Sequence, residues 1–561
     1  MDIEEFRQRG KDMVDFICTY YETLSSRRVY PDVEPGFMTT LFPSEAPKKP
    51  DQWDSIINDV KEILIPGLTH WQHPHFHAYF ANGLCSASIL GSFLADALAC
   101  LGFSWASSPS VTELEEITCD WLAKALGLPS HFIFHSPNSN GGGVIQSSAS
   151  ECVLICLIAA RAQAIQYLKE QSKEPELDDT VYLAKLVAYT STEAHSCLEK
   201  AAKIAMVKLR VLEPDDECSL RGPVLAEAIE EDIKSGYHPF FVSCTLGTTS
   251  SAGFDNLKEI GPICVKFPAL WLHVDAAYAG NGFICPELRY LKEGLEFADS
   301  FNTNANKWLL VGFDCSLLWV KDRYKLTTAL MVDPLYLRYD HMNDSIDFRH
   351  WGITLSRKFR ALKLFFVLRD LGVEGIQSKI RNDIKMAKEF EAMVIKDSRF
   401  EICNIVRTGL VCFRLNATDE INEELIGSIN REGKLHLTPS RVKDKFVLRF
   451  CVIHPYSDIN LIRNAWSIIQ EHAASVLALG DPAARRVSGE STKTHAESRR
   501  FSFVLPVPQD VYDEQSSKKT LKDDTMPVLV VDDEAVNDTG LDSFGKVSDK
   551  QPDSHFVSSA I

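Results

Sequence analysis

Short runs of apolar residues alternate with amphipathic stretches through the middle of the chain. The runs that predict buried strands are 186–189, 240–244, 270–274 and 316–320, and the stretches that predict helices between them are 196–207 and 224–235. Strands that are apolar on both faces and alternate with helices indicate a mostly parallel sheet covered on both sides. We therefore expect an α/β fold, with a large domain over residues 86–385.

The two ends of the chain have different patterns. Residues 1–85 begin with apolar residues near helical spacing, from Phe6 to Ile17, and then contain repeated prolines. We expect an N-terminal helical segment whose apolar side needs a cover, and a second subunit is one candidate. Residues 386–480 return to alternating helices and strands, which predicts a small α+β domain. Residues 481–561 are rich in Ser, Asp, Lys and Pro, which is typical of a disordered, acidic tail.

One predicted helix has signals at both ends. Thr112-Glu-Leu-Glu115 has the spacing of a capping box, and Gly127 with Pro129 is typical of a helix end. The apolar positions expected on one face of this helix are Leu114, Ile117, Trp121, Leu122, Ala125 and Leu126.

Charge and cysteine usage restrict the class of protein. Acidic residues outnumber basic ones by 77 to 59, giving a formal net charge of −18. This balance disfavours nucleic acid or an anionic membrane as the main partner. The N-terminus is charged where a signal peptide is apolar, and no apolar run reaches the roughly 18 residues of a membrane span. Fifteen cysteines without a CxxC pair are typical of reduced thiols. We expect a cytoplasmic protein without a membrane segment.

The first motif that can carry chemistry is a glycine run, Gly141-Gly-Gly143, which feeds hydroxyl residues up to Ser150 and then a helix from Glu151. Free N–H groups at a helix start, together with serine hydroxyls, can hold a phosphate. No Gly-Lys-Ser/Thr follows, so a nucleoside triphosphate site is not supported. A flexible turn with a serine cap is the alternative interpretation.

Three more residues can be combined with this anion site. Asp275 ends an apolar strand, where a buried acid needs a cation or strong donor, and a helix cap is the alternative. Lys307 follows a polar segment, 302–306, that reads as a turn; a partly desolvated lysine can form a Schiff base with an aldehyde. His195 stands near a helix start, where it can stack on a flat ring, although a core histidine is commoner. Phosphate site, acid, amine and ring-stacking imidazole together match pyridoxal phosphate.

The chain resembles the group II pyridoxal-phosphate decarboxylases of aromatic amino acids from about residue 1 to 475, and within them the arthropod tyrosine decarboxylases. The segments that carry the resemblance are His70-Trp71, 76–80, 102–105, 141–146, 193–197, 245–249, 273–280, 302–308 and 333–337. The resemblance implies the fold of type I pyridoxal-phosphate transferases, with an α/β large domain, a small α+β domain and an N-terminal helical segment. It also implies a homodimer with shared active sites.

The resemblance implies a role for individual residues. Lys307 would hold the cofactor aldehyde, Asp275 its ring nitrogen, and Ala277 with His195 the two ring faces. Tyr336, on a mobile loop over about 323–349, would be the catalytic proton donor, and Lys307 and His195 would also be catalytic. The residues implied around the cofactor phosphate are Ala149, Ser150, Asn304 and Thr249. The residues implied on the substrate side are Trp71, Tyr79, Phe80, Asn82, His195, Leu101, Phe103 and Ser356, of which Leu101 and Phe103 would reach the neighbouring subunit's pocket.

The implied reaction is α-decarboxylation, with L-tyrosine to tyramine as the first choice. Ser356 stands where dopa decarboxylases have glycine and histidine decarboxylases have serine, which disfavours dopa and leaves histidine open. Aromatic aldehyde synthases share the site, but His195 and Tyr336 favour plain decarboxylation. Ala81 and Asn82 depart from the Tyr-Phe-Pro-polar pattern of the family, so a catalytically silent dimerising homologue also remains.

Two further patterns are weaker. His70, His73, His75 and His77 lie within eight residues, and the last three would share one face of an extended segment. No cysteine or carboxylate accompanies them, so we expect no metal. In the tail, two arginines precede Ser488 and two precede Ser502, as basophilic kinases prefer, with chance occurrence as the alternative.

Overall fold

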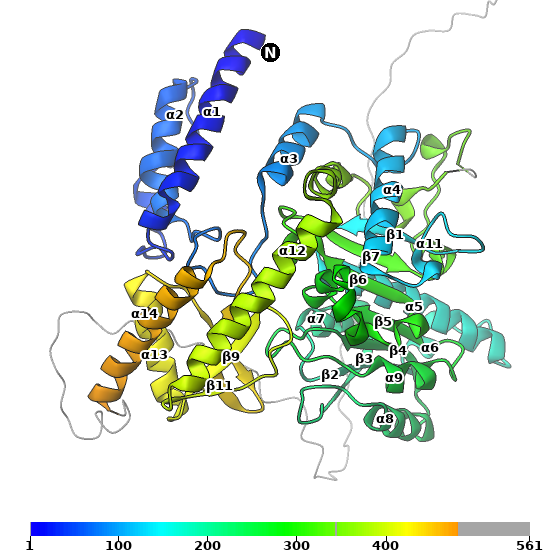
Figure 1. Cartoon of the computed structure of the whole chain (residues 1–561). Helices are drawn as coiled ribbons and strands as arrows, with labels where there is room; N and C mark the ends of the chain where they lie inside the picture. Colours follow the sequence, from blue (N-terminus) through cyan, green and yellow to red (C-terminus); the bar gives the residue numbers. More distant parts are fainter. Residues whose placement is uncertain (1, 343–344, 481–561) are drawn as a thin grey trace, which may run out of the picture. The chain divides into compact units, whose positions relative to one another are not determined.

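The structure, a computed structural model, describes residues 2–342 and 345–480 (Figure 1). The predicted tail over 481–561, with Ser488 and Ser502, lies outside these residues. The strands of a seven-stranded sheet are β1 Gly142–Gln146, β2 Leu186–Ser191, β3 Lys208–Leu212, β4 His238–Thr245, β5 Trp271–Asp275, β6 Ser300–Asn304 and β7 Ser316–Val320. Their order is β1-β7-β6-β5-β4-β2-β3. The expected α/β class is confirmed.

The sheet is mostly parallel, as expected, but β7 is antiparallel to both of its neighbours, β1 and β6. Three strands were not predicted. β1 is rich in glycine, and β3 is an edge strand with an exposed Lys208. β6 is polar, and its side chains hydrogen-bond to Trp271, Asp275 and Ala276 in and after the neighbouring strand β5. The segment read as a polar turn over 302–306 is therefore the end of β6 and the start of the helical turn α10 (Ala305–Trp308).

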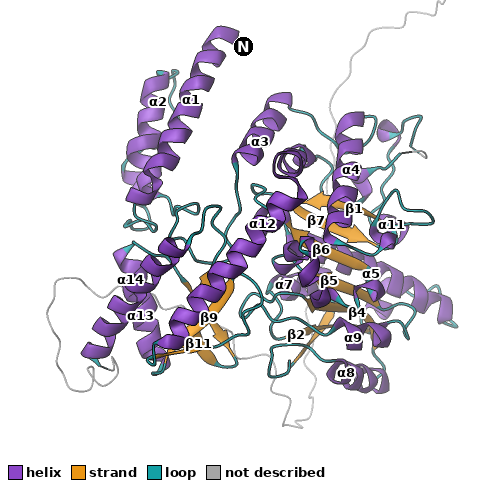
Figure 2. Cartoon of the chain, viewed as in Figure 1, coloured by secondary structure: helices purple, strands orange, loops and turns teal. Residues whose placement is uncertain are grey.

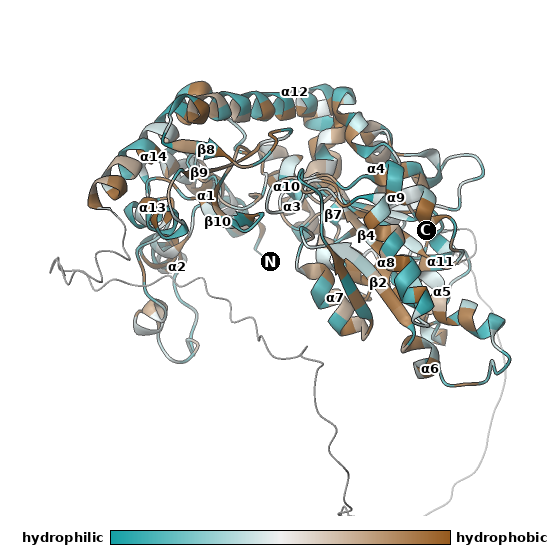
Figure 3. Cartoon of the chain, turned by 90° about the horizontal axis from the view of Figure 1, so that it is seen from below, coloured by the Kyte–Doolittle hydropathy of each residue, from teal (hydrophilic) through white to brown (hydrophobic). Residues whose placement is uncertain are grey.

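Helices cover both faces of this sheet. One face packs on α5 (Ala149–Gln171) and α7 (Cys197–Ala205), and the other on α4 (Pro109–Leu126), α8 (Gly222–Lys234) and α9 (Leu257–Cys264). Side chains of β2 alternate between the two cores, as the period of a strand requires: Leu186 and Ala188 face one, Val187 and Tyr189 the other. Figure 3 shows the hydrophobic strands β2 and β4 in brown.

By length and composition, α5 is long and apolar enough to cross a membrane, and it is the one such helix among the described residues. It contacts β1 and β4 to β7, and 44% of its apolar window is buried inside the protein.

The expected start of α4 is wrong. α4 begins one turn earlier, at Pro109, so Thr112 is inside it and donates to the carbonyl oxygen of Ser108 at 3.2 Å. Glu115 is buried and accepts from the backbone N–H of Ile145 at 2.8 Å and from Arg357. The buried face differs too, since Ile117 and Trp121 are exposed. The partners of Glu115, Ile145 and Arg357, lie far from it along the chain, so local spacing could not reveal them. The helix does end at Gly127, in a left-handed conformation.

A second, antiparallel sheet has the order β10-β11-β9-β8 and lies within residues 400–451. Its strands are β8 Phe400–Ile402, β9 Leu410–Leu415, β10 Thr438–Val442 and β11 Lys445–Cys451, and its helices are α13 Asp419–Glu432 and α14 Ile459–Leu479. α12 (Arg360–Lys396) changes direction at Gly372. It contacts α3 and α4 beside the large sheet and α14, β8 and β9 of the small domain, and Figure 2 shows it running between the two groups of strands. The proposed boundary between residues 385 and 386 therefore falls within one helix.

The N-terminal segment contains the predicted helix, α1 (Ile3–Thr23), followed by α2 (Trp53–Asp59), and α3 (Ser86–Leu98) begins directly after the segment. No residue of α1 is buried, and apolar side chains of α1 and α3 are exposed, among them Ile3, Phe6, Val14, Leu90, Phe93, Leu94 and Leu98.

Candidate active site

Lys307 lies in α10, a single helical turn that follows β6. Its ammonium nitrogen is 5.6 Å from the centre of the Phe80 ring. Burial lowers the pKa of Lys307, and the Asp275 carboxylate opposes this shift. Because a lowered pKa leaves more of the amine unprotonated, Lys307 is suited to attack an aldehyde carbon.

Asp275 is the last residue of β5, at the edge of the sheet where the parallel strands end. It lies opposite Asn302 of β6, whose Nδ2 donates to Asp275 Oδ1 at 3.3 Å. The backbone N–H of Ala277, in the turn after β5, donates to the same oxygen at 2.9 Å. Both bonds use Oδ1, so Oδ2 remains able to accept from a protonated ring nitrogen.

His195 lies in an exposed turn before α7, so it is not the core histidine of the alternative interpretation. The backbone N–H of Cys197 donates to its Nδ1 at 3.1 Å, which leaves the proton of the neutral ring on Nε2. The surrounding protein lowers the pKa of His195, Asp275 raises it and Lys307 lowers it. The charges of Asp275 and Lys307 therefore lie near enough to His195 to shift its pKa.

The predicted phosphate site is at the start of α5. This helix begins at Ala149, two residues before the start expected at Glu151. Ala149 and Ser150 are its first residues, whose N–H groups have no partner within the helix. Asn304 Oδ1 accepts from the hydroxyl of Ser316 at 2.6 Å, which leaves Asn304 Nδ2 to donate to an anion. Thr249 is exposed in the turn after β4.

The glycine run itself has another role. A Cβ atom on Gly141 would lie 1.9 Å from the carbonyl oxygen of His131, and one on Gly143 would lie 2.6 Å from the indole nitrogen of Trp319. These glycines therefore allow β1 to pack closely, and the anion donors come from the residues after them.

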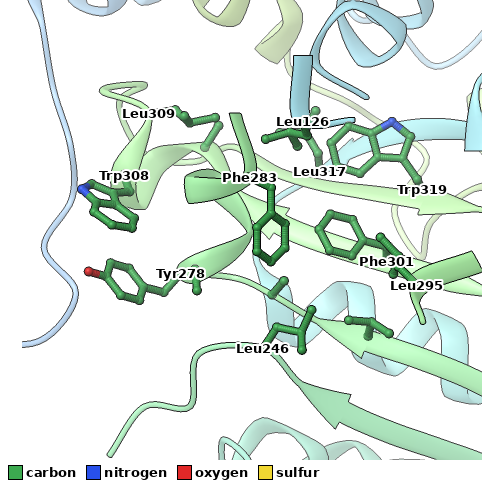
Figure 4. Close-up of a cluster of buried hydrophobic side chains, with 14 of the residues drawn as sticks. Leu126, Leu246, Tyr278, Phe283, Leu295, Phe301, Trp308, Leu309, Leu317 and Trp319 are labelled. Atoms are coloured by element: carbon green, nitrogen blue, oxygen red, sulfur yellow. The ribbon is translucent and has the colours of Figure 1, made fainter. Parts of the chain in front are cut away.

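Three aromatic rings form a stack next to Lys307. The rings of Phe80 and Tyr278 are 3.7 Å apart and nearly parallel, and Tyr278 stacks on Trp308 at 4.8 Å. Figure 4 shows Tyr278 and Trp308 one above the other at the edge of a buried apolar cluster. The neighbouring segment is fixed to α10, because the N–H of Gly83 donates to the carbonyl oxygen of Asn306 at 2.7 Å.

Arg449 of β11 was not predicted from the sequence. Its guanidinium is 4.9 Å from the centre of the Phe80 ring, and its charge contributes to the lowered pKa of Lys307. The side chain is 3% exposed, and among the described residues its only hydrogen bond goes to Thr438 Oγ1 at 3.2 Å. A buried cation without a carboxylate is costly unless a ligand supplies an anion. The signal in the sequence was an arginine within the apolar strand 445–451.

The groups present fit pyridoxal phosphate: a buried amine, a carboxylate that can accept from the ring nitrogen, an imidazole for the ring face and helix N–H groups for the phosphate. A sequence profile of the pyridoxal-dependent decarboxylase conserved domain matches residues 35–416. The chain belongs to this family of decarboxylases. It is therefore a carboxy-lyase that uses pyridoxal phosphate.

Individual relatives agree with this assignment. The decarboxylase is 50% identical to rat (Rattus norvegicus) aromatic-L-amino-acid decarboxylase over 479 residues, 85% of this chain and 99% of that one. It is 48% identical to human (Homo sapiens) histidine decarboxylase, over 85% of this chain and 72% of the relative.

Solved structures have the same fold. Oryza sativa TDC with PLP and tryptamine matches with a TM-score of 0.81 at 34% identity, and Rhodiola rosea 4-hydroxyphenylacetaldehyde synthase with 0.78 at 38%. Each comparison covers 85% of this chain and 99% of the other. The expected type I fold of pyridoxal-phosphate enzymes is thereby confirmed.

Among the residues predicted for the substrate side, Trp71 stacks on Tyr79 at 5.3 Å, and both rings are partly exposed. Tyr79 has a left-handed backbone conformation with φ 56°, and its N–H donates to Thr438 Oγ1 at 3.1 Å. Asn82 is held by its carbonyl oxygen, which accepts from Gln72 at 2.6 Å, while its buried Oδ1 has no partner among the described residues. Ala81 is buried.

The other predicted substrate residues form a separate group. The N–H of Gly102 donates to the carbonyl oxygen of Arg357, and Arg357 donates back to that of Gly102, each at 3.3 Å. This pairing brings Leu101 and Phe103 next to Ser356. Leu101 is 51% exposed, and Ser356 is exposed as well.

Tyr336 is also exposed, at 80% of its surface, in a short turn over Leu335–Leu337. The structure does not bring this phenol to Lys307. We call Leu101, Phe103, Tyr336 and Ser356 the exposed edge, and Lys307, Asp275, His195, Phe80 and Arg449 the lysine cluster.

The histidine-rich segment packs the N-terminal part of the chain on the small sheet. It forms turns rather than the expected extended segment. His77 Nδ1 donates to the carbonyl oxygen of Cys451 at 2.9 Å, and its ring stacks on Phe450 at 3.9 Å. Among the described residues, no group of three His, Cys, Asp or Glu side chains is placed to hold a metal.

Proposed function

We propose that this decarboxylase removes the α-carboxylate of an aromatic L-amino acid, with L-tyrosine as the preferred substrate and tyramine as the product. The carrying observation is the buried guanidinium of Arg449 beside Lys307 and the Phe80 ring. It offers an anion-binding group next to an aromatic face, which an aromatic amino acid would satisfy with its carboxylate and its side chain. The names of the relatives support the same substrate class.

A buried acceptor supports a hydroxylated ring. Asn82 Oδ1 lies in the segment between Phe80 and Gly83 and has no donor among the described residues. A phenolic O–H would supply that donor, and an unpaired buried acceptor costs roughly 1–3 kcal/mol. Phenylalanine could not make this bond, so Asn82 favours tyrosine.

Each residue then has a task. Pyridoxal phosphate, when bound, would supply the electron-withdrawing group for the α-carbon of the substrate. Lys307 binds the cofactor aldehyde, Asp275 keeps the ring nitrogen protonated, and His195 covers one ring face. Arg449 holds the substrate carboxylate until it leaves. Tyr336 delivers the proton to the α-carbon when its loop closes.

We further propose a cytoplasmic homodimer in which the exposed edge of one subunit completes the lysine cluster of the other. The support is the exposure of Leu101 and Tyr336 together with the uncovered apolar residues of α1 and α3. All fifteen cysteines are free thiols, which agrees with a reducing compartment.

Product analysis tests the substrate. The purified protein with pyridoxal phosphate is given L-tyrosine, L-dopa, L-histidine, L-tryptophan or L-phenylalanine in turn, and the amine, aldehyde and CO₂ are measured. We expect tyramine and CO₂ with the highest kcat/KM for tyrosine. Histamine as the main product would mean that histidine, not tyrosine, is the preferred substrate. Aldehyde with ammonia would indicate an aldehyde synthase. If none of these amino acids gives a product although the cofactor is bound, the protein is the catalytically silent homologue.

Arg449 is tested by Arg449→Met, which keeps a long side chain without the charge. We expect kcat/KM to fall by roughly 10²-fold, as for other charge-assisted contacts, with the cofactor spectrum retained. An unchanged kcat/KM would assign the carboxylate to another group.

A further inference from the structure

α10, which carries Lys307, is a single turn of four residues. So short a helix has too few internal hydrogen bonds to keep its orientation, so its position depends on contacts with the rest of the protein. On one side the N–H of Gly83 donates to Asn306, as described above. On the other side the indole Nε1 of Trp308, the residue after Lys307, donates to Oδ2 of Asp383 at 2.8 Å.

Asp383 is a carboxylate inside α12 with none of its surface exposed. The ammonium of Lys379, one turn earlier, donates to the same oxygen and also to the carbonyl oxygen of Ile453 at 3.3 Å. Burial raises the pKa of Asp383 to about 6, and Lys379 opposes this shift. Apolar residues of the same size often stabilise a core as well as a buried ion pair does. The pair is therefore better explained by the orientation that it gives to Trp308 than by stability.

Trp308 transmits this orientation to the lysine cluster in two ways. It is adjacent in sequence to Lys307, and it stacks on Tyr278, which stacks on Phe80. The outer ring of this stack faces both the Lys307 ammonium and the Arg449 guanidinium. The middle ring is held at its hydroxyl, which accepts from the N–H of Gly409 at 3.1 Å. A rotation of the indole would therefore shift both the turn of Lys307 and the aromatic face beside it.

We propose that Asp383 is a positioning residue of the decarboxylase, which acts on Lys307 through the indole of Trp308. It sets the direction of the lysine amine and of the Phe80 face relative to the bound cofactor. The proposal concerns cofactor attachment, and it rests on the proposed function only where turnover of an aromatic amino acid is measured.

The test compares variants of the full-length protein loaded with pyridoxal phosphate. Lys379→Met with Asp383→Leu removes both charges together, so that neither is left buried and unpaired. Asp383→Asn keeps an oxygen that can accept from the indole. The matched control is Asp232→Asn, because Asp232 on α8 is also a buried carboxylate that accepts from an aromatic residue, the hydroxyl of Tyr189 at 3.0 Å, next to a cation.

The first measurement is the absorbance of the bound cofactor as a function of pH, which reports the ionisation of its bond to Lys307. We expect the midpoint to shift by at least about half a pH unit in the double variant, less in Asp383→Asn, and not in Asp232→Asn, even where the melting temperature falls equally. With the amino acid that the wild type decarboxylates, kcat should fall roughly tenfold at a nearly constant KM, the cost of a small misplacement.

An unchanged midpoint and kcat in the double variant at full cofactor occupancy would overturn the proposal, and so would an equal shift in Asp232→Asn. If the double variant does not fold, Trp308→Phe replaces it, since it keeps the ion pair and removes the indole N–H. An unchanged midpoint there would also overturn the proposal. A shifted midpoint in a protein whose wild type decarboxylates no aromatic amino acid would remove the proposed function and leave the positioning role intact.

Discussion

The lysine cluster and the exposed edge differ in how much of each is complete within one chain. In the cluster, side chains from β5, α10 and β11 are held by specific hydrogen bonds and by a three-ring stack. At the edge, Leu101 and Tyr336 are exposed to 51% and 80% of their surface. The groups proposed to act on the cofactor are thus fixed by the fold of one chain, whereas those predicted to act on the substrate need a further surface or a loop movement.

The largest expected effect tests the cluster itself. Lys307→Ala removes the amine proposed to bind the cofactor aldehyde, so turnover should fall on the order of 10³-fold or more. The visible absorbance of the lysine-bound cofactor should vanish, although the phosphate site can still hold some cofactor. A normal spectrum in this variant would place the attachment on another residue and remove the assignment of the cluster.

The next effect tests the edge. Tyr336→Phe deletes one hydroxyl from an exposed ring, so the cofactor spectrum and the melting temperature should stay unchanged. Loss of a general acid typically costs about 10²–10⁴-fold in rate. We expect the rate of amine formation to fall by this factor, and aldehyde, ammonia and peroxide to appear when the reaction is run in air. Amine output equal to that of the wild type would mean that His195 or water, not Tyr336, is the proton donor.

Mixing two variants tests whether the regions meet across subunits. Leu101→Glu leaves the cluster intact, so we expect full cofactor binding and roughly tenfold lower kcat/KM. When it is refolded together with Lys307→Ala, a mixed dimer combines one intact cluster with one intact edge. Activity above the sum of the separate variants is the expected result. No recovery in a mixture that forms dimers would mean that each chain completes its own site.

The smallest effect concerns the histidine-rich segment that packs on the small sheet. Burial lowers the pKa of His77 to about 3 and, with the nearby histidines, that of His73 to about 4. The unfolded chain therefore binds these protons first, so their contribution to stability is full above pH 6.5 and is lost as the pH falls toward these values. The loss is roughly 1.4 kcal/mol per pH unit for each proton.

His77→Asn checks this source of acid sensitivity. Its amide can still donate to the Cys451 carbonyl oxygen, but it cannot take up the proton. We expect urea unfolding between pH 6.5 and 4 to show a shallower loss of stability than in the wild type. An identical pH dependence would place the titration elsewhere.

Local sequence patterns were sufficient for much of the fold and for the family. Apolar runs located β2, β4, β5 and β7 because a strand buried on both faces must be apolar throughout. They missed β6, because its polar residues are stabilised by hydrogen bonds to neighbouring elements, such as those of Ser300 with Trp271 and of Thr303 with Ala276. The predicted start of α4 failed for a related reason: Glu115 binds Arg357, 242 residues away, rather than its own helix end.

The sequence by itself determined the identity of the chemical groups: an amine at Lys307, an acid at the end of an apolar strand, and donors before a long helix. These follow from residue type and neighbours along the chain. Only the tertiary structure decided that Arg449 lies beside the Phe80 ring and that Asp383 holds Trp308. Such contacts join residues far apart in the chain, and their energies depend on burial and distance, which no local pattern encodes.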